Sequence, residues 1–274
     1  MANQDQNEHR LSLSQRSDDD RASTLVSKVP QVTLAFWIIK IFATTVGETG
    51  GDALSMSLQL GYAVSSLIFL VLFSITLAAQ VTSKRYHPFT YWAVVIATTT
   101  VGTTMSDYLD RTLGLGYVIS SIVLFCGVLA VLFAWYRTTG AIEFENIRTR
   151  QSETFYWVTI LVSNTLGTAL GDFAATDLGL GFERGAIMFS GLLALVILAH
   201  FFTNIKSSLL FWSAYILTRP LGATLGDTLT KSHADGGFAL DRIGASLTIL
   251  ALMIVGIFLT SRRAKQFSDS REKA

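Results

Sequence analysis

Four carboxylates recur within long apolar stretches of this 274-residue chain, each five residues after a glycine. They are Asp52, Asp107, Asp172 and Asp227, and the first copy of the pattern also contains Glu48. A charged side chain inside a membrane-spanning stretch is costly, and such residues mark ion pathways and proton relays. Carboxylate oxygens are also the ligands that hard divalent cations prefer. The pattern therefore points to cation or proton chemistry.

Neutral oxygens and two cations lie near these carboxylates, because positions four apart share one face of a helix. Lys40 and Arg219 are expected to pair with carboxylates, Arg219 with an aspartate of a neighbouring repeat. Alternatively, Lys40 could snorkel to the cytoplasmic interface, and Arg219 could contact an anionic substrate. With every group ionised, about three negative charges lack a partner, and they would bind a cation or take up protons. We expect neutral ligand oxygens from Thr44, Thr45, Thr99, Thr100, Asn164 and Thr165.

Small residues form a second stripe beside the polar one. Its members are Gly47, Gly51, Gly102, Gly167, Gly171, Gly222 and Gly226, with Ser106 in the remaining position. Small residues four apart let transmembrane helices approach closely. Such a stripe usually serves packing alone, so two interpretations stand side by side: helix packing only, or packing around an ion site.

The composition indicates a membrane protein. Half of the residues are hydrophobic and 15% are charged, whereas soluble domains carry about 25% charged residues. A net charge of +1 argues against nucleic-acid binding. The single cysteine, Cys126, leaves neither a disulfide framework nor a thiolate metal site.

Eight apolar segments are each close to the ~20 residues that cross a bilayer. The segments with motifs are 31–56, 89–109, 153–175 and 208–230, and the others are 62–82, 117–137, 183–203 and 239–261. Tryptophans at 37, 92, 157 and 212 recur 55, 65 and 55 residues apart, so a two-helix unit is repeated four times. These tryptophans fit an interfacial belt.

We therefore predict an all-α integral membrane protein of eight transmembrane helices. Because a two-span unit returns the chain to its starting side, the four two-helix repeats are parallel, related by an axis along the membrane normal. The odd-numbered helices, which carry the motifs, would form the core inside a lipid-facing ring. Residues 1–28 are predicted to be a disordered cytoplasmic tail, 29–262 the membrane domain and 263–274 a second cytoplasmic tail. Lysines and arginines concentrate in the loops on the N-terminal side, which places both termini in the cytoplasm.

The runs "FWIIKIFATTVGETGGD", "FYWVTILVSNTLGTALGDF" and "FWSAYILTRPLGATLGD" carry a resemblance over roughly residues 29–261. The chain resembles a bacterial family of uncharacterised membrane-anchored proteins, which implies the bacterial inner membrane. The shorter runs "GETGGD" and "LGDTLT" are loosely similar to calcium/manganese exporters with an E-x-G-D-K-T type motif. Here only the first repeat has the glutamate, and no repeat has a lysine directly after the aspartate.

The predicted function is secondary transport of a divalent cation, with manganese favoured, as proton-coupled export. The predicted partners are the lipid bilayer and the cation, with no nucleic acid, no cofactor and no enzymatic activity; a homo-oligomer is left open. The alternative is a membrane scaffold or assembly protein whose glycine motifs only pack helices. A third hypothesis, an intramembrane enzyme with an aspartate pair, needs two carboxylates that face one water-accessible point.

Overall fold

The computed structural model describes residues 30, 32–83, 86–142, 147 and 149–272, with side chains as far as residue 262. Every regular element in this part is helical, so the all-α prediction is confirmed there. The long helices are α2 (Leu34–Asp52), α3 (Gly61–Thr82), α4 (Pro88–Asp107), α5 (Gly116–Thr139), α6 (Arg150–Asp172), α7 (Gly181–Phe202), α8 (Ser207–Thr230) and α9 (Arg242–Glu272). Short elements are the π-helical turns η1 (Ala53–Ser57), η2 (Tyr108–Thr112) and η3 (Phe173–Asp177), and the 3-10 turn η4 (His233–Asp235). The predicted tail 1–28 lies outside the described residues, and α9 continues past the predicted boundary at 262.

Local sequence signals set the helix ends. Thr33 caps α2 by accepting a hydrogen bond from the backbone N–H of Phe36 at 3.3 Å. Pro88 occupies the first turn of α4, where its missing N–H has no helical partner to lose. Three return helices begin with glycines in the left-handed region of φ, which other residues rarely adopt: Gly61, Gly116 and Gly181.

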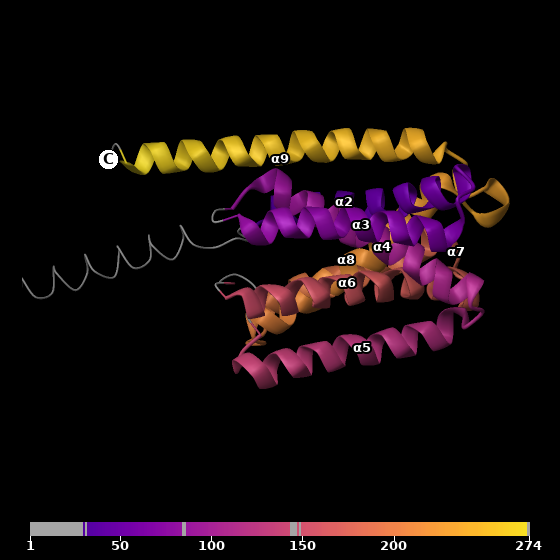
Figure 1. Cartoon of the computed structure of the whole chain (residues 1–274), viewed down its shortest axis with the longest axis horizontal. Helices are drawn as coiled ribbons and strands as arrows, with labels where there is room; N and C mark the ends of the chain where they lie inside the picture. Colours follow the sequence, from indigo (N-terminus) through magenta and orange to yellow (C-terminus); the bar gives the residue numbers. More distant parts are fainter. Residues whose placement is uncertain (1–29, 31, 84–85, 143–146, 148, 273–274) are drawn as a thin grey trace, which may run out of the picture.

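The four motif helices form a closed ring. Helix α2 contacts α4, α4 contacts α6, α6 contacts α8, and α8 contacts α2 again. Each return helix packs against the motif helix of the next repeat: α3 on α4, α5 on α6, α7 on α8, and α9 on α2. Figure 1 shows α5 and α9 at opposite edges, with the motif helices between them. The last helix therefore closes the ring on the first.

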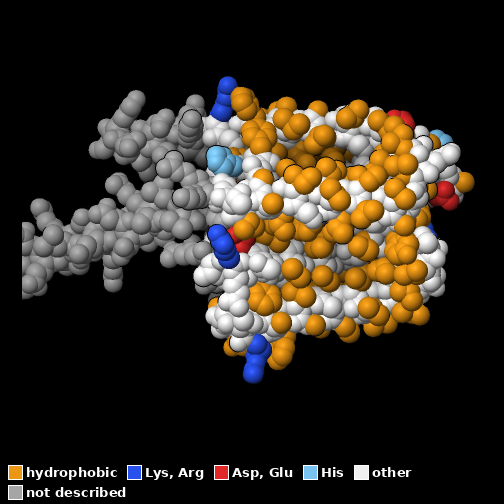
Figure 2. Space-filling view, viewed as in Figure 1, with side chains coloured by type: hydrophobic (Ala, Val, Ile, Leu, Met, Phe, Trp, Pro, Cys, Tyr) orange, Lys and Arg blue, Asp and Glu red, His pale blue; other side chains and the backbone are white. Residues whose placement is uncertain are grey.

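Burial separates the two kinds of helix. Within the described residues, five helices are long and apolar enough to cross a membrane: α3, α5, α6 with η3, α7 and α9. In the return helices among them, only 11% to 22% of the most apolar window is buried, against 72% in α6. In Figure 2 hydrophobic side chains cover the middle of the visible face, and most charged side chains lie towards its two ends. A surface of this kind suits lipid contact, and the apolar helices indicate a membrane protein.

Every first glycine of a motif receives one residue of the neighbouring motif helix. That residue always precedes the neighbour's own motif glycine by three positions. The four pairs are Gly47 with Thr99, Gly102 with Asn164, Gly167 with Arg219, and Gly222 with Thr44. One turn further along, Gly51 meets Thr103 and Gly226 meets Glu48. In both cases the residue numbers increase in the same direction along the two helices, so these neighbouring motif helices are parallel.

Threonine hydroxyls strengthen these contacts. Thr44 Oγ1 donates to the carbonyl of Thr218 at 3.1 Å, and Thr99 Oγ1 donates to the carbonyl of Ala43 at 3.1 Å. Both bonds join neighbouring motif helices, and both depend on the close approach that glycine permits.

A methyl group at Gly222 should therefore be poorly tolerated. It would overlap the Thr44 side chain and lie 2.9 Å from the Thr44 carbonyl carbon, which is backbone and cannot rotate away. We expect Gly222→Ala to lose about 3 kcal/mol of folding free energy, at the upper end of the usual overpacking cost. Unfolding in detergent would measure this loss. Gly191→Ala in α7 is the control, because nothing lies within 4 Å of its added methyl group, and equal stability of the two variants would contradict the packing described here.

Three of the four repeat tryptophans do not belong to the exposed interfacial belt that the sequence favoured, and Trp37 is half-buried. Trp92, Trp157 and Trp212 are buried, and they pack with Tyr91 and Tyr156. Each precedes a residue of the polar stripe by seven positions, or about two helical turns, so it lies on the same inward helix face. Aromatic side chains therefore fill the N-terminal end of the ring.

Candidate functional site

The four motif aspartates lie at the C-terminal ends of the motif helices, and all four are buried. In the first three repeats the α-helix ends at the aspartate and a π-helical turn follows: η1, η2 and η3. Such turns are frequent at functional sites. In the fourth repeat, α8 continues to Thr230.

Two basic side chains join these aspartates in pairs. Arg111 Nε lies 3.1 Å from Asp107 Oδ1, and Arg111 Nη2 lies 3.4 Å from Asp172 Oδ2. Lys231 Nζ lies 3.0 Å from Asp52 Oδ2 and 3.2 Å from Asp227 Oδ1. Each basic residue follows its own aspartate by four positions and reaches the aspartate of the next repeat around the ring. The aspartate end therefore has an approximate two-fold pattern.

Sequence reasoning missed these cations. It counted only Lys40 and Arg219 and left out Arg111, Lys231 and Arg242, although the i, i+4 spacing from Asp107 and Asp227 was a usable signal for the first two. Arg242 Nε lies 3.7 Å from Asp52 Oδ2. Counting these three cations removes the predicted excess of about three negative charges.

Lys231 keeps its charge in this setting. Burial lowers the pKa of Lys231, but the carboxylates of Asp227 and Asp52 raise it more, and its pKa lies well above the ordinary lysine value. An ammonium cation therefore stands between two aspartates.

Arg219 pairs with Glu48 and not with the aspartate that the sequence favoured. The guanidinium is fully buried, and Nη1 and Nη2 each lie 3.1 Å from Glu48 Oε2. Nη2 also donates to the Thr103 hydroxyl. The physical reason is axial position, because Arg219 precedes Asp227 by two helical turns and lies level with Thr44. Glu48 is one turn beyond Thr44 and is the first carboxylate within reach.

Lys40 has no acidic partner within the described part of the chain, contrary to the predicted ion pair. Its side chain is fully buried, and Nζ lies 4.2 Å from the centre of the Tyr215 ring. It therefore does not snorkel to the interface either. A cation over an aromatic face is attracted by the ring electrons.

The predicted neutral ligands lie apart from the aspartates. Thr44, Thr99 and Asn164 are level with Arg219, where each contacts a glycine of the neighbouring helix. The hydroxyls of the other three donate within their own helices: Thr45 to Ile41 at 2.9 Å, Thr100 to Ile96 at 3.1 Å, and Thr165 to Leu161 at 3.0 Å. Thr103, which was not among the predicted ligands, contacts Glu48 Oε2 at 3.2 Å.

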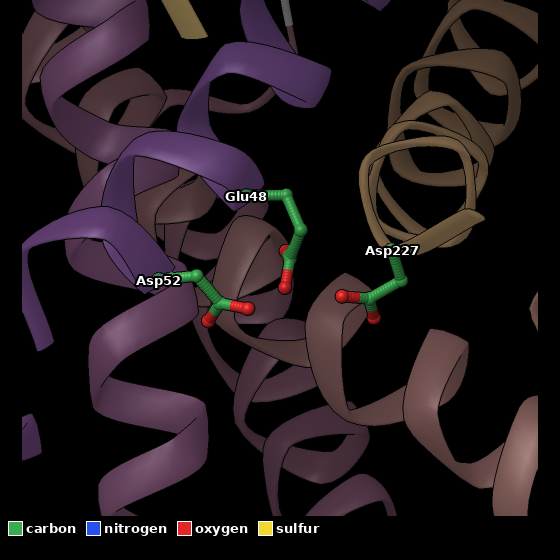
Figure 3. Close-up of side chains that lie close together, drawn as sticks. All are labelled: Glu48, Asp52 and Asp227. Carbon is green, nitrogen blue, oxygen red and sulfur yellow. The ribbon is translucent and has the colours of Figure 1, made fainter. Parts of the chain in front are cut away.

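Three of the five predicted carboxylates converge. Glu48, Asp52 and Asp227 each offer an oxygen, and these oxygens lie within 4.8 Å of one another. Figure 3 shows the three side chains pointing toward one shared space, two from α2 and one from α8. Asp107 and Asp172 are outside this group, and on their side of the ring Thr168 occupies the position that corresponds to Glu48.

The converging group lies at the contact between α2 and α8, which we call the seam because the first and fourth repeats meet there. Lys40, Glu48 and Arg219 are the main departures from the repeat pattern, and all three lie on these two helices. The buried carboxylate oxygens of this group can hold a cation, since two of the carboxylates already bind the Lys231 ammonium. The converging carboxylates and these three departures from the repeat are therefore concentrated at one seam and not spread over four equivalent positions.

Fold and site together define a helical repeat protein with an apolar exterior and a buried polar ring. The chain belongs to the family described as Repeat of Unknown Function (DUF347), whose model matches residues 35–86, 90–141, 155–206 and 210–266. This match confirms the four repeats and the resemblance to an uncharacterised family. No curated protein and no solved structure matches the chain. The likeness to calcium/manganese exporters therefore rests on the short acidic runs alone.

Proposed function

We propose that this protein is a secondary transporter of a divalent cation in the bacterial inner membrane. The observation that carries the proposal is the convergence of Glu48, Asp52 and Asp227 at the seam. Two of these carboxylates, Asp52 and Asp227, already pair with the Lys231 ammonium, a cation of the chain itself. Three carboxylates form a hard, all-oxygen ligand set that suits manganese, calcium or magnesium. Manganese is favoured through the likeness of the acidic motif to manganese exporters.

The proposed topology has eight spans and both termini in the cytoplasm. The exposed apolar helices α3, α5, α7 and α9 would face lipid. Helices α2, α4 and α8 have fewer apolar residues because they carry the polar stripe, and their neighbours shield them. The bilayer core offers no water to polar groups, so a polar pathway across it must be shielded from lipid. Polar motif helices surrounded by apolar return helices meet this requirement.

Lys231 gives the proposal a mechanism. Its ammonium neutralises Asp52 and Asp227 while the site holds no transported ion. An entering divalent cation would displace the ammonium and take the oxygens of the same carboxylates. When the cation leaves, Lys231 returns or the carboxylates take up protons, since uncompensated charges there are costly. Exchange of cation against proton would then drive export.

A neutral side chain at Asp227 should abolish transport. Asp227→Asn keeps the size of the side chain but removes the charge that binds the cation, so we expect transport to fall at least about tenfold. Manganese content and tolerance of cells that lack the protein would be measured after complementation, with membrane insertion checked in parallel. Asp241→Asn is the control, because Asp241 is exposed and only caps Gly244 at 2.6 Å. Normal metal content and tolerance in the deletion strain would overturn the proposal.

A scaffold or assembly role is the second candidate, and one observation favours it: cations already pair with all five motif carboxylates. In a scaffold these pairs would only stabilise helix contacts. Asp227→Asn would then leave function intact, whereas Gly222→Ala would disrupt it.

A further inference from the structure

The seam contains a second polar group, on the N-terminal side of Glu48, in which donors lack acceptors. Among the described residues, Lys40 Nζ, the Tyr215 hydroxyl and Arg219 Nε are buried without a hydrogen-bond partner. Lys40 Nζ lies over the Tyr215 ring at 4.2 Å, and Arg219 is one turn further along α8 from Tyr215. Arg219 Nη1 in turn lies 3.4 Å from the Thr44 carbonyl, one turn along α2 from Lys40. The three donors therefore occupy one stretch of the α2–α8 contact.

Charge in this stretch is unbalanced in the positive sense. Lys40 and Arg219 are two cations, and Glu48 is the one carboxylate that pairs with either of them in the described residues. The aspartate end of the ring has the opposite imbalance, with four aspartates against Arg111, Lys231 and Arg242. A buried ammonium without an acceptor is strongly unfavourable. A missing negative charge next to Lys40 would resolve it.

Size and chemistry limit what could supply that charge. The positions equivalent to Lys40 and Tyr215 in the other two repeats are Val95 and Ile160, both fully buried and without polar atoms. A large or polyvalent anion would find too few donors among these side chains, whereas one negative charge suffices to balance Lys40. The requirements match a small, weakly hydrated monovalent ion.

We propose that the seam binds one monovalent anion of the chloride class, held by Lys40 Nζ with the Tyr215 hydroxyl and Arg219 Nε as further donors. The anion would balance the charge of Lys40 locally, on the side of Glu48 opposite to the cation site. The proposal does not depend on which cation, if any, is transported, so its test is separate from the transport experiment.

Chloride should stabilise the full-length protein in detergent. The thermal midpoint would be followed by tryptophan fluorescence while sodium chloride replaces sodium gluconate at constant ionic strength. We expect a saturable rise of at least about 5 °C at a hundred times the dissociation constant, with bromide and nitrate acting in the same way. Lys40→Gln should abolish the rise, and Lys206→Gln, at an exposed lysine, should retain it.

Tyr215→Phe keeps the test decisive if Lys40→Gln does not fold. It removes one hydroxyl donor and should weaken chloride binding about fivefold. Equal midpoints in chloride and gluconate would overturn the proposal, as would undiminished chloride stabilisation in the variant Lys40→Gln. A midpoint that varies with pH but not with chloride would also overturn it, since Lys40 would then reach neutrality by losing its proton.

Discussion

Arg219→Met is expected to destabilise the protein by about 3–5 kcal/mol, because it leaves the Glu48 carboxylate buried and unpaired. Arg219 Nη1 and Nη2 each lie 3.1 Å from Glu48 Oε2, and both side chains are buried in the ring. The methionine fills much of the same volume but supplies no charge and no donor. Denaturant unfolding of the purified protein, or the yield of folded protein if unfolding is irreversible, would measure the loss.

The double variant Arg219→Met, Glu48→Gln separates charge from shape. Removing the second charge as well should restore most of the stability, because replacing a whole buried ion pair is often nearly neutral. Arg111→Met is the comparison at the aspartate end, where water reaches the side chain, 30% of which is exposed. A single Arg219→Met variant as stable as the wild type would show that Glu48 has another partner or is uncharged.

The same double variant distinguishes the two candidate functions. A protein that folds but no longer transports would assign the Arg219–Glu48 pair to the cation pathway. A scaffold would keep its function, since the glycine contacts of the ring remain in place. Stability and function are thus read from one pair of residues.

Local and periodic features of this fold could be predicted from the sequence. Hydrophobic length located the long helices, and the spacing of the tryptophans gave the repeat unit. The two stripes also indicated which helices lie inside, since α2, α4, α6 and α8 carry both of them. These features depend on residues close together in sequence, so one repeat already contains the information.

Pairing between repeats could not be derived in the same way. Whether Arg219 reaches Glu48 or an aspartate depends on which helices are neighbours and how they are aligned along the axis. The closure of α8 on α2 forms the seam, which brings together residues that are far apart in the sequence, such as Glu48 and Asp227. The prediction of an interfacial belt was wrong for Trp92, Trp157 and Trp212 for a related reason. Tryptophan is typical of a membrane interface, but these three lie on helix faces that point inward.

Lys231→Gln should turn the seam into a stronger cation site. Without the ammonium, three buried carboxylates repel one another, and the protein should be less stable in the absence of divalent cations. Added manganese should then stabilise Lys231→Gln more than it stabilises the wild type. At a hundred times the dissociation constant the expected gain is about 2.7 kcal/mol. Thermal unfolding across a manganese titration, repeated with calcium and magnesium, would measure the effect and its selectivity.

Arg111→Gln is the matched control that the two-fold pattern provides. Arg111 joins Asp107 and Asp172 as Lys231 joins Asp227 and Asp52, but the position of Glu48 is taken there by Thr168. Two carboxylates form a poorer divalent site than three, so manganese should rescue Lys231→Gln and not Arg111→Gln. Equal rescue of both variants would place the site elsewhere. No rescue of Lys231→Gln would mean that these carboxylates serve only to pair with cations of the chain.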